Sequence, residues 1–209
     1  MNNKSLAERR DSMKKIITIS REFGSGGRTI GKRLAEELGV PCYDSEILEK
    51  VAAESGFAEE YIKDKGEYSP SSLIMGLFTN RTLYTGPTNE DKIWIAQCKI
   101  IKELAQKGPC VIVGRCADYI LRDRDDLIKV FIFADIKERA KRIVEHYGET
   151  DVEPVKRLKE KDKRRAAYYQ HYTDMNWGAS RNYDVCLNSS VVGIEESVRI
   201  LKDIVLNAD

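Results

Sequence analysis

The sequence predicts an α/β protein in which helices cover both faces of a five-stranded parallel sheet. Five short apolar segments, rich in β-branched residues, alternate along the chain with segments of helical periodicity. No two successive strands are joined by a hairpin-type turn, and strands connected through helices pair in parallel. A chain of 209 residues, 42% of them hydrophobic, is long enough for one domain of this class with a small inserted subdomain.

The first strand and its helix are the most sharply defined elements. Residues 16–19, Ile-Ile-Thr-Ile, have the composition of a buried strand. Three glycines then fall within four positions, between Gly24 and Gly27. The helix that follows is expected to end at Gly39. Its expected buried face carries Ile30, Leu34 and Leu38.

The later elements follow in chain order. A short strand at 40–43 leads through Asp44, a candidate N-cap, into a helix over 46–53. The other expected elements are a helix capped by Asn89 and reaching Lys107, a strand at 110–113, a strand at 128–133, a helix at 136–147, a strongly charged helix at 153–170, a strand at 183–187 and a final helix at 194–206.

Two segments fall outside this alternation. Residues 1–12 are polar, without apolar periodicity, and predict a flexible N-terminal tail ahead of a domain spanning 13–209. Residues 56–89 hold a short charged helix candidate at 58–65 and then a stretch rich in Ser, Pro, Gly and Thr. This composition indicates an inserted segment that closes over a ligand, and an ordinary surface excursion is the alternative.

The strand, the glycine turn and the start of the helix together resemble an anion-binding device. Unpaired N–H groups and the positive end of a helix converge there, and glycine lets the backbone approach a phosphate closely. A standard P-loop reads G-x-x-x-x-G-K-[ST]. With Thr29 as the magnesium-binding hydroxyl, Gly27 stands near the position of the lysine, and Arg21 and Arg28 are the nearby cations. The alternative is a plain strand-to-helix turn.

Several polar segments follow the ends of the predicted strands. Ligands of parallel α/β sheets gather at the carboxyl ends of the strands, so these segments are expected to meet. They are the glycine loop, Asp44-Ser45, Gly114-Arg115 and Asn188-Ser189-Ser190. This convergence favours phosphate binding over a plain turn.

Composition excludes several other classes of protein. The formal net charge of +1 provides no general attraction to nucleic acid or to a membrane surface. No apolar run approaches the roughly 20 residues needed to cross a bilayer, and no signal peptide is visible. Five scattered cysteines without metal-ligand spacing indicate reduced thiols in a cytoplasmic protein without a zinc site. Nothing in the sequence indicates the oligomeric state.

Five sequence pieces carry a family resemblance through their order and spacing: SREFGSGGR at 20–28, YDS at 43–45, VGRCAD at 113–118, KERAKR at 137–142 and the basic cluster at 159–165. Together they resemble the cytidylate-kinase-like family of P-loop kinases over most of residues 14–206. The resemblance implies a three-layer P-loop kinase fold with an acceptor-binding helical insertion at about 56–89 and a basic lid at about 150–180.

The resemblance also implies an activity and roles for individual residues. The expected activity is ATP-dependent phosphoryl transfer to a nucleoside monophosphate, with ATP and Mg²⁺ bound and no nucleic acid or membrane partner. The implied donor-site residues are Gly24, Ser25, Gly26, Gly27, Arg28 and Thr29, with Thr29 on the metal and Ser189 near the donor base. The implied acceptor-binding residues are Asp44, Ser45, Arg115 and Asp118. The implied catalytic cations are Arg28, Arg115, Lys161, Arg164 and Arg165, with Arg28 or Arg21 in place of the lysine.

Departures from the family pattern leave alternatives open. The missing lysine suggests a nucleotide-binding regulatory module that has lost the chemistry. The family reads D-G-R-D where this chain has Val113 and Cys116 in place of the acids, and this suggests a kinase of a non-nucleotide metabolite. Asp118, about one helical turn beyond Arg115, either compensates for those acids or faces solvent. For residues 161–165 the alternative is a solvated charged helix.

Overall fold

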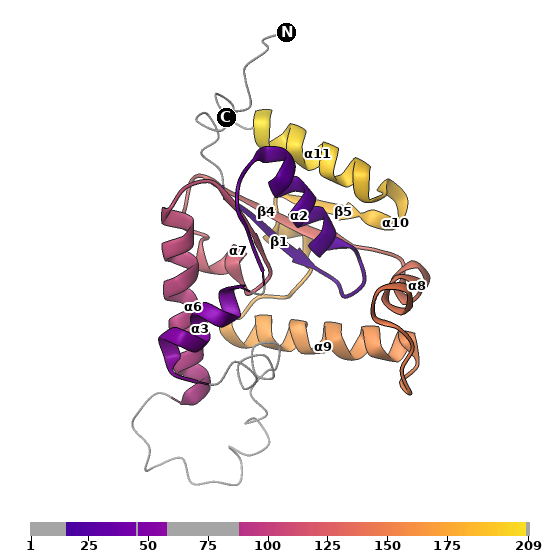
Figure 1. Ribbon diagram of the computed structural model, residues 1–209, viewed down its shortest axis with the longest axis horizontal. Coiled ribbons are helices and arrows are strands. Elements are labelled where there is room, and N and C mark those ends of the chain that lie inside the picture. Colours follow the sequence, from indigo (N-terminus) through magenta and orange to yellow (C-terminus); the bar gives the residue numbers. More distant parts are fainter. Residues whose placement is uncertain (1–15, 45, 58–87, 208–209) are drawn as a thin grey trace.

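The computed structural model describes residues 16–44, 46–57 and 88–207, and it confirms the predicted class. Five parallel strands form one sheet in the order β2-β3-β1-β4-β5, and helices cover both of its faces (Figure 1). The strands are β1 (Ile16–Arg21), β2 (Cys42–Tyr43), β3 (Cys110–Val113), β4 (Leu127–Phe133) and β5 (Val185–Asn188).

Each face of the sheet has its own apolar layer. Ile17 and Ile19 of β1 pack toward α2 (Gly27–Leu38) and α11 (Ile194–Asn207). Ile16 points to the opposite face, because successive side chains of a strand alternate. That face is covered by α3 (Glu46–Ser55), α6 (Asn89–Gln106) and the short α7 (Ala117–Ile120). Full burial of side chains of this size stabilises the fold by about 1.5–3 kcal/mol each.

Helix α2 follows the sequence prediction closely. Ile30 and Leu34 are fully buried under the sheet, and Leu38 lies on the same face. Gly39 ends the helix in the left-handed region, at φ 66°, and its N–H donates to the carbonyls of Ala35 and Glu36. The buried face of α2 holds the helix against the sheet, so the helix begins close to the end of β1, where the glycine loop lies.

The remaining elements are α8 (Ile136–Tyr147), α9 (Pro154–Thr173), a short 3₁₀ turn η1 (Ser180–Asn182) and α10 (Ser189–Val192). Helix α9 is strongly charged, as expected, and yet Leu158, Tyr168 and Tyr169 are buried on one side of it. Tyr172 of the same helix stacks on Trp94 of α6, with ring centroids 4.2 Å apart. One face of α9 therefore packs against the body of the domain.

The starts of α6 and β5 differ from the prediction, and several other element ends shift by one to three residues. Thr88, and not Asn89, caps α6: Thr88 Oγ1 accepts from the Asp91 N–H, and the Asp91 carboxylate accepts from the Thr88 N–H. This reciprocal pair is a capping box, and Asn89 has no counterpart three residues later that completes one. The last strand begins at Val185 and not at 183, because Tyr183 still belongs to the end of the 3₁₀ turn at 180–182; its ring packs on Phe131, with centroids 4.9 Å apart.

Several predictions concern residues outside the described part of the chain. They are the tail at 1–12, the short helix at 58–65, nearly all of the insertion at 56–89, and Ser45. Within the described ranges, none of the helices combines the length and apolar character that a membrane span requires.

Candidate functional site

A cavity of about 630 Å³ opens at the carboxyl ends of the first three strands. It lies beside Arg21 at the end of β1, Asp44 after β2 and Arg115 after β3. Its basic lining residues are Arg21, Arg28, Arg115, Arg142, Arg157, Lys161 and Arg165, and its acidic ones are Glu22 and Asp44. A cavity with this excess of cations favours a polyanionic ligand.

The glycine loop forms one wall of this cavity. Gly24 and Gly26 have φ of +77° and +80°, a left-handed conformation that glycine adopts without strain. A Cβ on Gly24 would lie 2.9 Å from the Arg139 carbonyl oxygen, so the loop has no room for a larger residue there. Helix α2 begins at Gly27, and its N-terminus therefore faces the cavity together with the loop.

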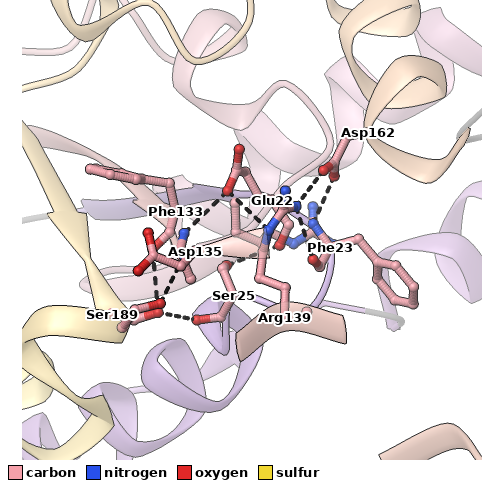
Figure 2. A network of polar contacts seen from close by, with 12 residues as sticks. Glu22, Phe23, Ser25, Phe133, Asp135, Arg139, Asp162 and Ser189 are labelled. Atoms are coloured by element: carbon pink, nitrogen blue, oxygen red, sulfur yellow. Dashed lines mark hydrogen bonds and ion pairs between the residues drawn. The ribbon is translucent and has the colours of Figure 1, made fainter. Parts of the chain in front are cut away.

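Two serines predicted for the donor site stabilise the glycine loop on the side away from the cavity. Ser25 and Ser189 are buried, and neither is among the residues that line the cavity. Ser25 Oγ donates to the Glu22 carbonyl at 2.9 Å, and Ser189 Oγ donates to the Ser25 carbonyl at 2.6 Å (Figure 2). Their side chains stabilise the shape of the loop, and a direct contact of either residue with the donor nucleotide stays a prediction.

A buried charge network anchors the loop on its other side (Figure 2). The Arg139 side chain is 9% exposed and pairs with the carboxylates of Glu22, at 3.4 Å, and Asp162. Asp162 also accepts from the Phe23 N–H at 2.8 Å, and Arg139 donates to the Phe23 carbonyl at 3.2 Å. Burial raises the pKa of Glu22, and the Ala134 amide and the Arg139 charge oppose that rise.

The sequence reasoning did not assign this network a role. Its signals in the sequence were the position of Glu22 between the first strand and the glycines, and the position of Arg139 in the 137–142 motif. Arg142, on the next turn of α8, donates to the Gly24 carbonyl at 3.1 Å and lines the cavity. Arg142 and Arg157 are further cavity cations that the sequence reasoning did not single out.

Thr29 and Arg28 lie on the first turn of α2 and line the cavity. Arg28 forms an ion pair with Asp44, whose side chain is 12% exposed against 49% for Arg28. The pair joins a predicted donor-site cation to a predicted acceptor-site acid. The role of Asp44 as a helix N-cap stays a prediction.

Arg115 emerges from an uncommon stretch of backbone. Gly114, Arg115 and Cys116 are consecutively left-handed, with φ of 77°, 60° and 52°. A non-glycine residue in this region costs about 1–3 kcal/mol, and such strain is concentrated at functional sites. The Arg115 carbonyl accepts from Gln97 Nε2 at 3.0 Å, which helps to hold this turn. Arg115 lines the cavity, as predicted for an acceptor-binding cation.

Asp118 is buried, with 3% of its surface exposed, so the solvent-facing alternative is wrong. Its carboxylate accepts from Tyr169 Oη at 2.7 Å and from Ser20 Oγ at 3.5 Å. Burial raises the pKa of Asp118, and these hydrogen bonds oppose the rise. Asp118 is not among the cavity-lining residues, so a direct contact with substrate stays a prediction.

The basic residues of α9 divide between two faces of the helix. Arg157, Lys161 and Arg165 recur every four residues and line the cavity, so the solvated-helix alternative does not apply to this face. Arg165 Nη1 also donates to the Arg21 carbonyl at 3.0 Å. Arg164 is half-buried and is not among the cavity-lining residues.

The residues that line the cavity fit a nucleoside triphosphate with its magnesium ion. The lining supplies an excess of positive charge, and the Thr29 hydroxyl lies on the first helical turn beside the glycine loop. Among the described residues no three His, Cys, Asp or Glu side chains form a metal cluster. Proteins commonly hold Mg²⁺ through substrate phosphates, waters and one or two protein oxygens, and the Thr29 hydroxyl is an oxygen of this kind.

Comparisons with known proteins point in the same direction. A model of the cytidylate kinase-like family matches residues 16–191. A cytidylate kinase of Archaeoglobus fulgidus is 30% identical over 190 residues, which cover 88% of this chain and 91% of that protein. A solved structure of an uncharacterized protein from Eubacterium ventriosum is 30% identical, with a TM-score of 0.69 and coverage of 92% of this chain and 99% of the other. Shikimate kinase from Acinetobacter baumannii is 16% identical, with a TM-score of 0.54 over 95% and 98% of the two chains, and shares the fold.

Proposed function

Because the chain belongs to the cytidylate kinase-like family, we propose that it is an ATP-dependent kinase of nucleoside monophosphates, with CMP as the first candidate acceptor. One structural observation carries the proposal. The glycine loop, the Arg115 turn and the basic face of α9 border the same cavity, so a donor, an acceptor and charge-stabilising cations all fit around one centre.

On the donor side, the backbone N–H groups of the loop and of the first turn of α2 bind the phosphates of ATP. Thr29 would hold Mg²⁺ through its hydroxyl, and the metal would supply neutralisation of charge on the donor phosphates. The buried network around Arg139 keeps the loop in its binding shape before the substrate arrives, which is electrostatic preorganisation.

On the acceptor side, Arg115 orients the monophosphate, and Asp44 with Ser45 completes the acceptor contact. Lys161 and Arg165 stabilise the charge that develops on the transferring phosphoryl group. This role is supported for Lys161 and Arg165 by their position in the lining of the cavity. For Arg164 the same role is supported by the family resemblance alone. Asp118 acts by fixing Tyr169 of α9 and Ser20 of β1 beneath the site.

The proposal extends to the organisation of the domain. Residues 56–89 form the acceptor-binding insertion and 150–180 the basic lid, in a domain spanning 13–209 behind a tail at 1–12. The lid assignment draws support from the contact of Asp162 with the glycine loop, because that contact brings α9 against the phosphate site.

The test is an acceptor screen on the purified protein. MgATP is combined in turn with CMP, dCMP, UMP, AMP and GMP, and with shikimate as a non-nucleotide acceptor, and the products are separated by chromatography. We expect ADP and a nucleoside diphosphate to form in equal amounts, most rapidly with CMP. Arg115→Ala should lower kcat/KM for the acceptor by about 100-fold or more. Arg199→Ala, on the exposed face of α11, should stay within about twofold of the wild type.

Other outcomes would contradict the proposal in different ways. MgATP binding without turnover of any acceptor would favour the regulatory module. Turnover confined to the non-nucleotide acceptor would favour a metabolite kinase.

A further inference from the structure

The space beside Gly27 is already occupied by another side chain. A Cβ added to Gly27 would lie 2.6 Å from Arg21 Cβ and 3.1 Å from Arg21 Cγ, with Ile132 Cβ at 3.2 Å. Contacts under 3.0 Å are essentially never made by real Cβ atoms. With Thr29 as the magnesium-binding hydroxyl, residue 27 is near the position at which a standard P-loop carries its lysine. Here the Arg21 side chain runs through the space in which a side chain at position 27 would begin.

The other end of the same side chain lies against Gly114. A Cβ on Gly114 would lie 3.0 Å from Arg21 Cζ and would overlap with Nη1. The guanidinium therefore lies next to the residue that precedes Arg115. Gly27, at the start of α2, and Gly114, after β3, have no side chains and so leave room for the Arg21 side chain. That side chain extends from the glycine loop toward Arg115.

Arg21 borders both cavities at this end of the sheet. It lines the main cavity with the glycine loop, and it lines a smaller one, of about 40 Å³, with Arg115 and Arg165. Arg165 donates to the Arg21 backbone carbonyl at 3.0 Å, so α9 fixes residue 21 in place. Arg28, the other nearby cation, has its guanidinium in an ion pair with Asp44. Arg28 lines the main cavity but not the smaller one, whereas Arg21 lines both.

We propose that Arg21 replaces the P-loop lysine as the cation on the transferring phosphoryl group, and that glycine at positions 27 and 114 is required for its path. The inference rests on the proposed kinase function. An oxygen of the acceptor phosphate forms a bond to the γ-phosphorus while the bond from that phosphorus to the bridging oxygen breaks, and ADP leaves with the electron pair. Arg21 stabilises the shifting charge by hydrogen bonds from its planar fork and transfers no proton.

The test exchanges the two cations. Arg21→Gln removes the charge and keeps most of the side-chain volume, and it should lower kcat by about 100-fold or more with an unchanged melting temperature. Arg21→Gly combined with Gly27→Lys removes the Cβ and Cγ atoms that a side chain at position 27 would meet and supplies a cation from that position, and it should regain at least about tenfold of that loss. Gly27→Lys alone should be impaired, because the new side chain meets Arg21. Arg199→Gln serves as the matched surface control and should stay within about twofold of the wild type.

Each outcome decides the matter. An Arg21→Gln variant within about threefold of the wild type would overturn the inference and leave the kinase function standing, as would a folded double variant that regains nothing. If the double variant fails to fold, Arg21→Lys replaces it, and activity no higher than that of Arg21→Gln would overturn the inference.

A wild type that phosphorylates no acceptor would refute the proposed function, and MgATP affinity measured by calorimetry would then decide the role of Arg21. If the MgATP affinity of Arg21→Gln is about tenfold or more below that of the wild type, Arg21 contacts the phosphates. An unchanged MgATP affinity would overturn the inference.

Discussion

Asp162 of helix α9 accepts a hydrogen bond from the backbone nitrogen of Phe23 in the glycine loop, at 2.8 Å. The two residues are 139 positions apart, and their contact joins the proposed lid helix directly to the proposed donor site. The second oxygen of the same carboxylate pairs with Arg139, which in turn pairs with Glu22 (Figure 2). One carboxylate thus fixes the loop backbone and balances a buried guanidinium.

Removal of this carboxylate should be costly. Asp162→Ala leaves Arg139 buried with Glu22 as its remaining carboxylate partner, and loss of one partner of a buried pair typically destabilises by about 3–5 kcal/mol. We expect the free energy of unfolding, from urea denaturation, to fall by about 3 kcal/mol. Glu196→Ala removes an exposed partner of Arg199 and should leave the free energy of unfolding close to that of the wild type. Equal effects of the two variants would show that the network contributes no more than a surface pair.

Asp118 predicts a specific dependence of stability on pH. Burial raises the pKa of its carboxyl above the usual 3.8, so the folded state binds more protons than the unfolded state as the pH rises from 3.8 toward the raised value. The contribution of Asp118 to stability therefore falls through that window. Asparagine still accepts the hydrogen bond from Tyr169 and carries no charge. Relative to Asp118→Asn, the wild type should lose stability from about pH 4 upward, as measured by urea unfolding at a series of pH values. Parallel curves for the two proteins would contradict this.

The five cysteines should differ in their reactivity toward thiol reagents. Burial raises the pKa of the Cys110 thiol to about 12, and it raises the pKa of Cys116 well above 9. Both thiols stay protonated and enclosed at neutral pH, and the thiolate is the reactive form. Of the five cysteines, at most the other three should react with a thiol-specific disulfide reagent in the native protein, and all five after unfolding. Rapid reaction of four or five in the folded protein would show that the region around β3 opens readily.

Thr29 should act through its hydroxyl. Thr29→Ala should lower kcat by about 100-fold and raise the Mg²⁺ concentration needed for half-maximal rate, because the metal loses a protein ligand. Thr29→Ser keeps the hydroxyl and should recover most of the activity. Steady-state rates across a magnesium titration measure both effects. A serine variant as impaired as the alanine variant would show that Thr29 contributes packing and not a metal ligand.

The sequence predicted the sheet because β-branched runs and glycine stops are local signals. Residues 16–19 and Gly39 determine their own conformations to a large degree, and the convergence of loops at the carboxyl ends follows from parallel pairing. The position of Arg115 could be predicted for the same reason, because it directly follows β3.

What could not be predicted depends on distant contacts. Asp118 is buried because Tyr169, 51 residues later, packs over it and donates a hydrogen bond. The sequence could not indicate which face of α9 meets the cavity, and so Arg157, one turn before Lys161, was not singled out. The catalytic role of Arg164 stays a prediction. Gly27 marked the missing lysine, and only the path of Arg21 shows why a side chain is excluded there.

The most direct test of the account is a phosphorus NMR time course on the protein with MgATP and CMP. It reports where the γ-phosphoryl group goes. We predict that the ATP signals decay while those of ADP and CDP grow together, and that Arg115→Ala slows this exchange. Decay of ATP to ADP and free phosphate, or a spectrum that does not change although MgATP binds, would contradict the claim that this cavity transfers phosphate to a nucleoside monophosphate.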